Sequence, residues 1–300
     1  MKALDNLNDE QMAAATTTAA RALVIAGPGT GKTATIIGRI VNLLSSGFNP
    51  DHIVAITFTR KAAGEIRARL AVVCPGGAAG TRQMQGSTFH ALAYRIVSEC
   101  LAFFRDNFGT PLYQPGLTVV GPDEQKEALE LLAARQQLKK ASSVVKQAIA
   151  LLRPEATRTD PDFQSEAERQ ATTLAGLYRL QLQEANAIDL DHLIPMATRA
   201  LGECSILESY RARWPHLLVD EYQDTSLDQQ ALVDLLASRS VVCVGDVDQS
   251  IYAWRGANPA GMLAYASREG VERYALRQNY RSCPRVVTAA VNLIRNNRER

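Results

Sequence analysis

The feature that most constrains the fold of this chain is the glycine-rich segment AGPGTGKT at residues 26–33. An apolar run at residues 22–25 precedes it, and a segment whose apolar residues have helical spacing, 34–44, follows it. A glycine-rich turn between a buried strand and a helix leaves backbone N–H groups facing a concavity, and the helix N-terminus adds partial positive charge. The segment therefore predicts a strand, a phosphate-binding loop and a helix, in that order.

The loop follows the pattern G-x-x-x-x-G-K-[ST], with Ala26 in place of the first glycine. Lys32 is expected to supply positive charge for the outer phosphates, and Thr33 to offer its hydroxyl to Mg²⁺. Glycines permit backbone torsions and a close approach that side chains would block. We expect the whole loop to contact a nucleotide: Ala26, Gly27, Pro28, Gly29, Thr30, Gly31, Lys32 and Thr33.

Composition indicates a soluble globular chain of two domains. Of its 300 residues 46% are hydrophobic and 21% charged, and the formal net charge is +2, so any basic surface for nucleic acid would have to be local. The five cysteines are far apart without a C-x-x-C pair, which disfavours a disulfide framework or a zinc site. The N-terminus lacks the apolar stretch of a signal peptide, and no run of about 18 apolar residues occurs. We therefore expect a cytoplasmic protein that makes no contact with a membrane.

A second strand and helix follow the first pair. After a turn cluster at 47–51, residues 52–58 form an apolar run typical of a buried strand, and a helix is expected from residue 59. Two such units predict a doubly wound parallel sheet, whose ligands gather at the carboxyl ends of the strands. Phe58 ends this second strand, a position where an aromatic residue more often belongs to the core.

The apolar spacing from about residue 100 to residue 200 is helical. It is clearest at 121–138, 142–153 and 165–185, and no convincing strand interrupts it. We interpret this block as a helical insertion within the α/β domain.

Two adjacent acids, Asp220 and Glu221, end the next buried strand, which is predicted at 216–221. Side chains alternate along a strand, so the two carboxylates can do different work at its end. One can hold Mg²⁺, and the other can orient or deprotonate an attacking water. A surface charge pair is the alternative, but the phosphate loop favours the catalytic interpretation because such acids complete its site.

Tyr252 and Trp254 alternate beside Arg255, shortly after a further buried strand predicted at 240–245. Aromatic side chains in this position can form an exposed platform on which nucleic-acid bases stack. From spacing alone, core packing of Trp254 is an equally good interpretation.

Seven stretches together resemble the UvrD/Rep-like group of superfamily 1 DNA helicases. The most specific are DEYQDTS and GDVDQSIYAWRGA, and the others are LNDEQ, AGPGTGKT, ITFTRKAAGEIRARL, STFHALA and LRQNYRS, all in the family's order and spacing. The resemblance covers the whole chain, although the helical block matches in position and character more than in residues. Ser87 stands where a glycine is common in the family, which affects only local loop geometry.

The resemblance implies an ATP site. Gln11 resembles the residue that reads the adenine edge, Tyr280 the residue that stacks on the adenine ring, and Arg39 a residue nearby. Asp220 matches the carboxylate that holds Mg²⁺, and Glu221 matches the group that activates water.

Further residues match parts that couple the nucleotide to the rest of the motor. Lys32 and Thr33 match the residues that hold the phosphates and Mg²⁺, Gln249 resembles the γ-phosphate sensor that communicates with DNA, and Arg281 matches an arginine that reaches the γ-phosphate from a second motor core. Phe58, Tyr252 and Trp254 match aromatic residues that stack on single-stranded bases. The segments that touch the DNA backbone contain Thr57, Thr59, Thr88 and His90.

The implied fold is α/β. A RecA-like P-loop NTPase core with a parallel sheet would occupy residues 1–95 and 206–277, a mostly helical inserted subdomain residues 96–205, and the start of a second motor core residues 278–300. The implied activity is ATP-driven translocation on single-stranded DNA and duplex unwinding, with ATP and Mg²⁺ as cofactors and single-stranded DNA and single/double-strand junctions as partners. Since a second core contributes a further arginine, we expect these 300 residues alone to hydrolyse ATP weakly and to unwind little.

Two other functions compete with this interpretation. The chain could be a single-stranded DNA binding module that does not turn over ATP, using only its aromatic platform. A P-loop kinase acting on a small acceptor is disfavoured, because it leaves Tyr252, Trp254 and the DEYQD run unexplained.

Overall fold

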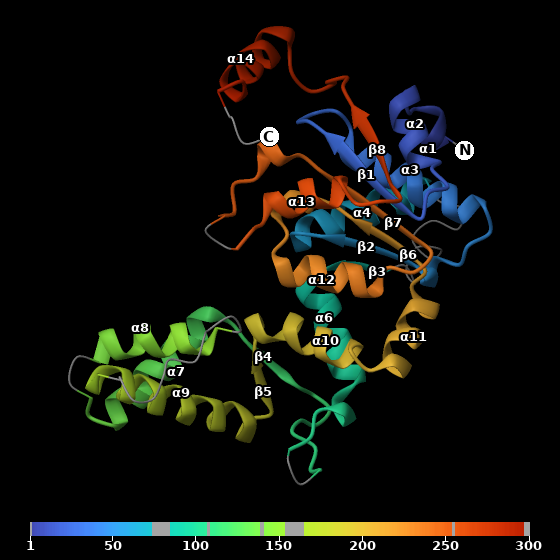
Figure 1. Ribbon diagram of the computed structural model, residues 1–300. Coiled ribbons are helices and arrows are strands. Elements are labelled where there is room, and N and C mark those ends of the chain that lie inside the picture. The colour runs from blue at the N-terminus through green and yellow to red at the C-terminus, as the bar shows by residue number, and fades with distance from the viewer. Residues whose placement is uncertain are drawn as a thin grey trace. The chain divides into compact units, whose positions relative to one another are not determined.

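The computed structural model divides into two compact units, one of residues 1–89 with 201–300 and one of residues 90–200 (Figure 1). It describes residues 2–73, 85–106, 109–138, 141–153, 165–253 and 256–296. The first unit carries the sheet that organises the phosphate loop, and the second is mostly helical.

The first unit is built on a six-stranded sheet in the order β3-β2-β6-β7-β1-β8, and every neighbouring pair in it is parallel. The predicted α/β class with a parallel sheet is confirmed. The inner strands β2, β6 and β7 have no exposed residue, as expected of parallel strands covered on both faces. The strands are β1 (Arg21–Ala26), β2 (Ile53–Thr57), β3 (Gln85–Thr88), β6 (His216–Val219), β7 (Ser240–Gly245) and β8 (Val271–Leu276).

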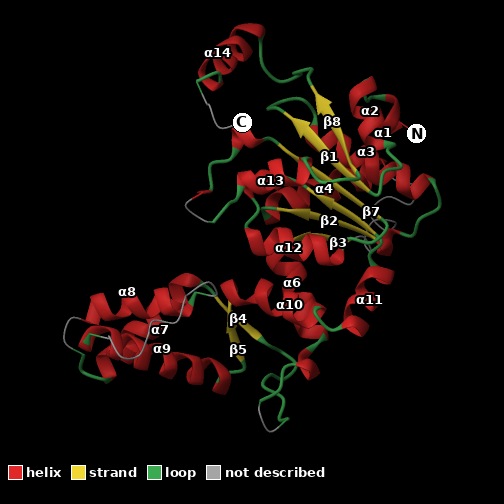
Figure 2. Cartoon of the chain, in the orientation of Figure 1, coloured by secondary structure: helices red, strands yellow, loops and turns green. Residues whose placement is uncertain are grey.

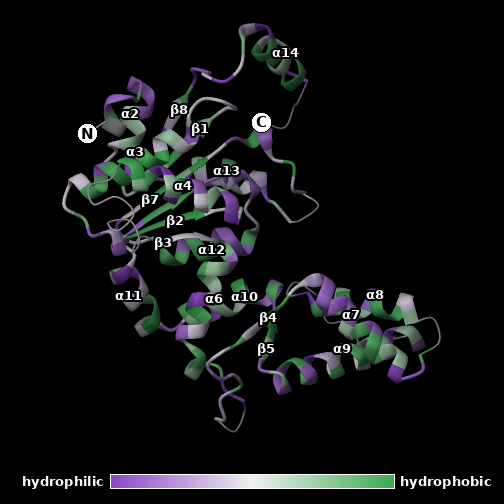
Figure 3. Ribbon diagram, turned by 180° about the vertical axis from the view of Figure 1, so that it is seen from behind, coloured by the Kyte–Doolittle hydropathy of each residue, from purple (hydrophilic) through white to green (hydrophobic). Residues whose placement is uncertain are grey.

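Helices lie on both faces of this sheet (Figure 2). Ile40 of α3 and Ile66 of α4 share one core cluster with Val24, while on the other face Tyr265 of α13 contacts Cys243. Figure 3 shows the hydrophobic residues gathered along α3 and the inner strands. The helices of this unit are α1 (Lys2–Asp5), α2 (Asp9–Ala15), α3 (Lys32–Ser45), α4 (Arg60–Val73), α11 (Cys204–Arg213), α12 (Leu227–Leu236), α13 (Pro259–Ala266) and α14 (Pro284–Ile294).

Short helical turns join some of these elements. The turns of this unit are η1 (Pro50–His52), η5 (Tyr222–Asp224) and η6 (Val247–Gln249). Asn8 caps α2 in a capping box with Gln11. None of the helices that the structure describes is both long enough and apolar enough to cross a membrane.

The second unit contains a cluster of three helices that bury Leu129, Ala148 and Tyr178 against one another. It also contains a two-stranded parallel sheet of β4 and β5, which corrects the expectation that no strand lies between residues 100 and 200. Each of these strands has three residues, too few to show a period in the sequence. The elements are α6 (Phe89–Glu99), which starts at the end of the first unit, η2 (Leu101–Phe103), β4 (Thr118–Val120), α7 (Pro122–Arg135), α8 (Ala141–Leu152), α9 (Glu166–Glu184), β5 (Ala187–Asp189), η4 (Leu190–His192) and α10 (Leu193–Leu201).

Candidate functional site

The glycine-rich loop joins the end of β1 at Ala26 to the start of α3 at Lys32, the context that the motif requires. Gly29 and Gly31 have φ values of 73° and 91°, in the left-handed region that other residues avoid. Thr30 closes the turn, because its hydroxyl donates to the carbonyl of Gly27 at 2.8 Å. The loop thus presents backbone groups at a helix N-terminus, where an anion is stabilised.

Lys32 stands at the centre of the candidate site. Its Nζ lies 2.9 Å from Oε2 of Glu221 and donates to Oε1 of Gln249 at 3.1 Å, and its side chain is only 12% exposed. These residues follow β1, β6 and β7, which are neighbours in the sheet, so their carboxyl ends meet at one edge. The structure therefore brings together three of the predicted catalytic side chains.

Asp220 is buried directly after β6, and its Oδ1 accepts the N–H of Glu221 at 3.0 Å. Burial raises the pKa of Asp220 to about 6, the negative charge of Glu221 adds to this, and Lys32 partly offsets it. Glu221 itself has φ 51° and ψ 48°, a left-handed conformation that is strained for a residue with a side chain. This conformation directs the side chain of Glu221 toward Lys32, while Asp220 stays buried.

Asp220 and Thr33 suit a magnesium ion. A carboxylate and a hydroxyl are hard oxygen donors, and Mg²⁺ in nucleotide sites takes one or two protein ligands together with phosphates and water. Burial and the charge of Glu221 disfavour the ionised form of Asp220, and a divalent cation bound there would favour it. Among the described residues, no three His, Cys, Asp or Glu side chains gather as a metal site of their own.

Gln223 is buried and connects Glu221 to Asp246 through hydrogen bonds. No role was assigned to it from the sequence. Its Nε2 donates to Oε2 of Glu221 at 2.9 Å, and its Oε1 accepts the N–H of Asp246 at 2.9 Å. Oδ2 of Asp246 in turn accepts from Nε2 of Gln249 at 2.5 Å. Gly245 leaves room for this arrangement, because a Cβ there would lie 2.5 Å from Oε1 of Gln223. The DEYQD run was the signal in the sequence, but nothing in it singled out its glutamine.

Two of the residues predicted to contact the adenine, Gln11 and Tyr280, make hydrogen bonds near the phosphate loop. Nε2 of Gln11 donates to the carbonyl of Thr30 at 2.9 Å, so Gln11 lies against the loop. Tyr280 is 56% exposed, and its hydroxyl accepts from Nδ2 of Asn8 at 2.8 Å.

Arg39 is buried and braces the chain that precedes β1. It donates to the carbonyls of Thr17 at 2.5 Å and Ala15 at 3.4 Å, and burial lowers its pKa. Within the described residues none of its hydrogen bonds reaches the phosphate loop.

Arg281 is placed beside the loop. Its Cβ would lie 2.7 Å from a Cβ added to Gly29, while the residue as a whole is exposed. The start of its side chain therefore lies next to the phosphate loop, and its contact with phosphates stays a prediction.

Phe58 and Tyr252, two of the three residues predicted to stack on bases, lie against each other. Their rings are stacked with centroids 4.9 Å apart at 25°, and both side chains are half-buried. Trp254, the third predicted member of the platform, lies outside the described residues. Two aromatic residues after β2 and β7 therefore share one surface on the first unit.

The predicted backbone-contacting residues fall into two units. Thr57 is buried and donates to the carbonyl of Thr59 at 2.9 Å, and Thr59 in turn accepts the N–H of Ala62 at the start of α4. Thr88 is half-buried at the end of β3. His90 belongs to the second unit, where burial lowers its pKa and Asp191 acts in the opposite direction.

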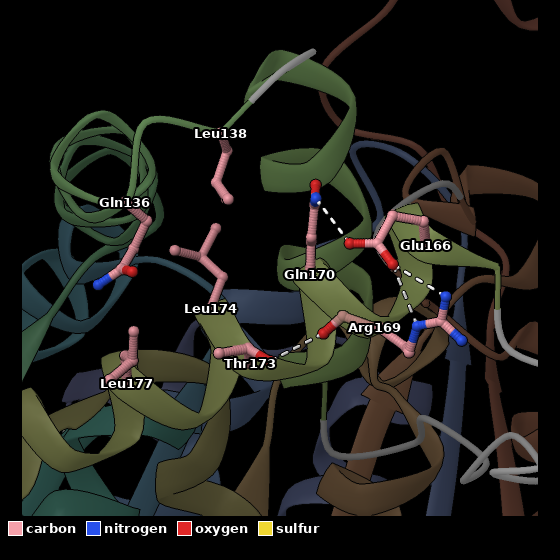
Figure 4. A pocket seen from close by; sticks show the side chains of 8 residues that line it. All are labelled: Gln136, Leu138, Glu166, Arg169, Gln170, Thr173, Leu174 and Leu177. Atoms are coloured by element: carbon pink, nitrogen blue, oxygen red, sulfur yellow. Dashed lines mark hydrogen bonds and ion pairs between the residues drawn. The ribbon is translucent and has the colours of Figure 1, made fainter.

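A separate cavity of about 200 Å³ opens on the helical unit beside α9 (Figure 4). Its polar groups bind one another, because Glu166 accepts from Arg169 at 2.9 Å and from Gln170 at 3.0 Å. None of the predicted site residues lines it.

Comparisons with known proteins agree with the geometry. The family model of the UvrD/REP helicase N-terminal domain matches residues 7–268. The chain is 36% identical over 311 residues to the ATP-dependent DNA helicase PcrA of Staphylococcus aureus, which covers 99% of this chain and 41% of the relative. It is 36% identical over 309 residues to the protein of the same name from Staphylococcus epidermidis, covering 98% of this chain and 41% of that relative. The chain thus spans less than half the length of these relatives.

Proposed function

The chain belongs to the UvrD/REP helicase family, and we propose that it binds and hydrolyses ATP to drive movement on single-stranded DNA. The observation that carries this proposal is the convergence of Lys32, Glu221 and Gln249 at the carboxyl edge of the sheet. A lysine, a carboxylate and an amide at the end of a phosphate loop are the groups that phosphoryl transfer to water requires.

In the proposed reaction the loop and Lys32 bind the phosphates, and Arg281 adds charge at the γ-phosphate. Glu221 accepts a proton from the water whose oxygen attacks the γ-phosphorus, while the bond to the bridging oxygen breaks and ADP leaves. Thr33 and Asp220 would hold Mg²⁺, which supplies positive charge to the phosphates when bound. We propose that the adenine binds between Gln11, which contacts its edge, and Tyr280, which stacks on its ring. Arg39 is proposed to lie nearby.

The stacked rings of Phe58 and Tyr252 support single-stranded DNA as the track. One base stacked on an aromatic side chain is worth roughly 1–3 kcal/mol, and this contact does not depend on the identity of the base. We propose that Trp254 joins this platform. The proposed contacts with the DNA backbone come from Thr57, Thr59, Thr88 and His90.

The test compares ATPase rates with and without oligo-dT in the wild type and in Glu221→Gln. Hydrolysis that oligo-dT stimulates and that Glu221→Gln abolishes supports the proposal. Binding of oligo-dT by a wild type that does not hydrolyse ATP would instead favour a single-stranded DNA binding module, a function that the Phe58–Tyr252 pair could serve without the phosphate loop.

A further inference from the structure

Two carbonyl groups of the phosphate loop are held by the segment that follows β8. Nδ2 of Asn279 donates to the carbonyl of Pro28 at 2.6 Å, and the N–H of Tyr280 donates to the carbonyl of Gly29 at 2.8 Å. These contacts join positions 251 residues apart in the chain. The segment after β8 therefore binds the phosphate loop. Within this segment, only Tyr280 and Arg281 were given a role from the sequence.

A third carbonyl is held by a residue of α2. Nε2 of Gln11 donates to the carbonyl of Thr30 at 2.9 Å, while its Oε1 is fixed by the N–H of Asn8. Three successive carbonyls of the loop thus each accept a hydrogen bond from a residue outside it. Each of these oxygens carries partial negative charge that would repel a phosphate if it turned inward.

The direction of each carbonyl also sets the direction of an N–H group. A trans peptide unit is planar and carries its C=O and N–H on opposite sides, so holding the oxygen on one side turns the following N–H to the other. A phosphate loop works by presenting such N–H groups to the anion. Donors that hold the carbonyls therefore preorganise the loop for phosphate.

Of the two donors in the segment after β8, Tyr280 uses its backbone N–H, whereas Asn279 uses its side chain. Its amide orientation is fixed, because Oδ1 accepts the N–H groups of Arg281 at 2.9 Å and Ser282 at 2.8 Å, which leaves Nδ2 facing the loop. A Cβ on Gly29 would lie 3.0 Å from this Nδ2, so the close approach depends on glycine. The segment is also anchored by Arg277, whose N–H and guanidinium both donate to Glu10.

We infer that Asn279 is a positioning residue for the phosphate loop, and that its side-chain amide sets the affinity of the loop for the terminal phosphates of a nucleotide. This inference rests on the proposed function. It assigns to Asn279 no contact with the nucleotide itself, so removing the amide should weaken binding of the phosphates and leave binding of the nucleoside unchanged.

The experiment measures competition by ADP and by adenosine against a fluorescent ADP analogue bound to the chain in the presence of Mg²⁺. Asn279→Ala should weaken ADP about three- to tenfold, the range for one lost hydrogen bond of this kind, with adenosine affinity and the urea unfolding midpoint unchanged. Asn279→Asp should weaken ADP further, because a carboxylate would face the Pro28 carbonyl and the phosphates. The matched control is Asn292→Ala, an exposed asparagine of α14, which should behave as wild type.

The outcomes separate this inference from the proposed function. If the wild type does not prefer ADP to adenosine, or if Lys32→Ala keeps that preference, the proposed function is wrong and the inference with it. If Lys32→Ala abolishes the preference but Asn279→Ala retains the wild-type ratio of the two affinities, the inference alone is overturned. A loss of ADP and adenosine binding in equal measure, with a lower urea midpoint, would assign Asn279 a purely structural role and would also overturn it.

Discussion

Nζ of Lys32 lies 2.9 Å from Oε2 of Glu221, a residue 189 positions later in the chain. The group proposed to bind phosphate and the group proposed to activate water are therefore bound to each other. We propose that a phosphate approaching Lys32 competes with this carboxylate for the ammonium group, and that its binding releases Glu221 to contact a water molecule. Under this proposal, nucleotide binding and the release of the proposed base are coupled through Lys32.

Removing the charge of Glu221 should strengthen nucleotide binding while it abolishes hydrolysis. Glu221→Gln leaves Lys32 without its anionic competitor, and we expect ATP to bind about two- to fivefold more tightly, the range for a partly exposed ion pair. A fluorescent ATP analogue titrated at fixed Mg²⁺ measures this. Glu208→Gln, which removes an exposed ion pair with Arg211, is the control. Weaker binding in Glu221→Gln would show that the two groups do not compete.

Gln223 should act on turnover through Glu221. Gln223→Ala removes the donor to Oε2 of Glu221 and leaves the buried N–H of Asp246 unpaired, so we expect kcat to fall about ten- to a hundredfold with little change in KM. The same variant should lose roughly 1–3 kcal/mol of unfolding free energy. Steady-state ATPase assays and urea unfolding measure the two effects. An exposed glutamine of α9, Gln181→Ala, serves as the control, and a kcat equal to wild type would refute the link.

His216 should make the protein less stable in acid. Burial first, and then the positive charges of Arg39 and Arg239 together with His52, lower its pKa from 6.5 to about 4. Between these two pH values the unfolded chain binds a proton at this residue that the folded chain does not. The unfolding free energy therefore falls as pH falls from 6.5 to 4, by at most about 1.4 kcal/mol per pH unit from this residue.

Replacing His216 should remove this contribution. Urea unfolding of the wild type and of His216→Phe across that pH window measures it, and the variant should show the shallower dependence. Equal slopes in the two proteins would mean that this histidine is protonated in the folded state as readily as in the unfolded one.

Phe58 should contribute to binding of single-stranded DNA. Its ring stacks on Tyr252 at 4.9 Å, and loss of one stacked base corresponds to roughly 1–3 kcal/mol. We therefore expect Phe58→Ala to weaken oligo-dT binding about five- to a hundredfold, as fluorescence anisotropy at one fixed salt concentration would measure. Phe103→Ala, which removes one ring from a packed aromatic pair in the helical unit, should leave the affinity unchanged. Equal affinities of Phe58→Ala and wild type would exclude this platform.

The sequence predicted the inner part of the sheet well, because β6 and β7 are uninterrupted apolar runs followed by polar residues. It did not indicate β3, whose Gly86 and Ser87 favour no strand and adopt one by pairing with β2. The edge strand β8 was missed as well, since the charged residues Glu272 and Arg273 interrupt its apolar residues. Strands of this kind depend on their neighbours more than on their own residues.

The candidate site shows a similar division. The acids at a predicted strand end indicated that Glu221 lies near Lys32, and the family resemblance implied that Gln249 belongs to the same site. The hydrogen bonds of Gln223 and Asn279 depend instead on the path of the turn after β6 and of the segment after β8. Backbone paths of this kind leave no periodic signal in a sequence, and the roles proposed for these residues remain predictions.

The strand order has a consequence for how the chain assembles as it is made. Within the part of the chain that the structure describes, the strand that leads into the phosphate loop, β1, pairs with β7 and β8, and both are synthesised from Ser240 onward. While residues 90–200 are being synthesised, β1 therefore has no partner strand at either edge, whereas α7, α8 and α9 already contain the residues of their own packed cluster. An unpaired strand edge can pair with another chain, so we predict that the nascent chain is most prone to aggregation during this interval.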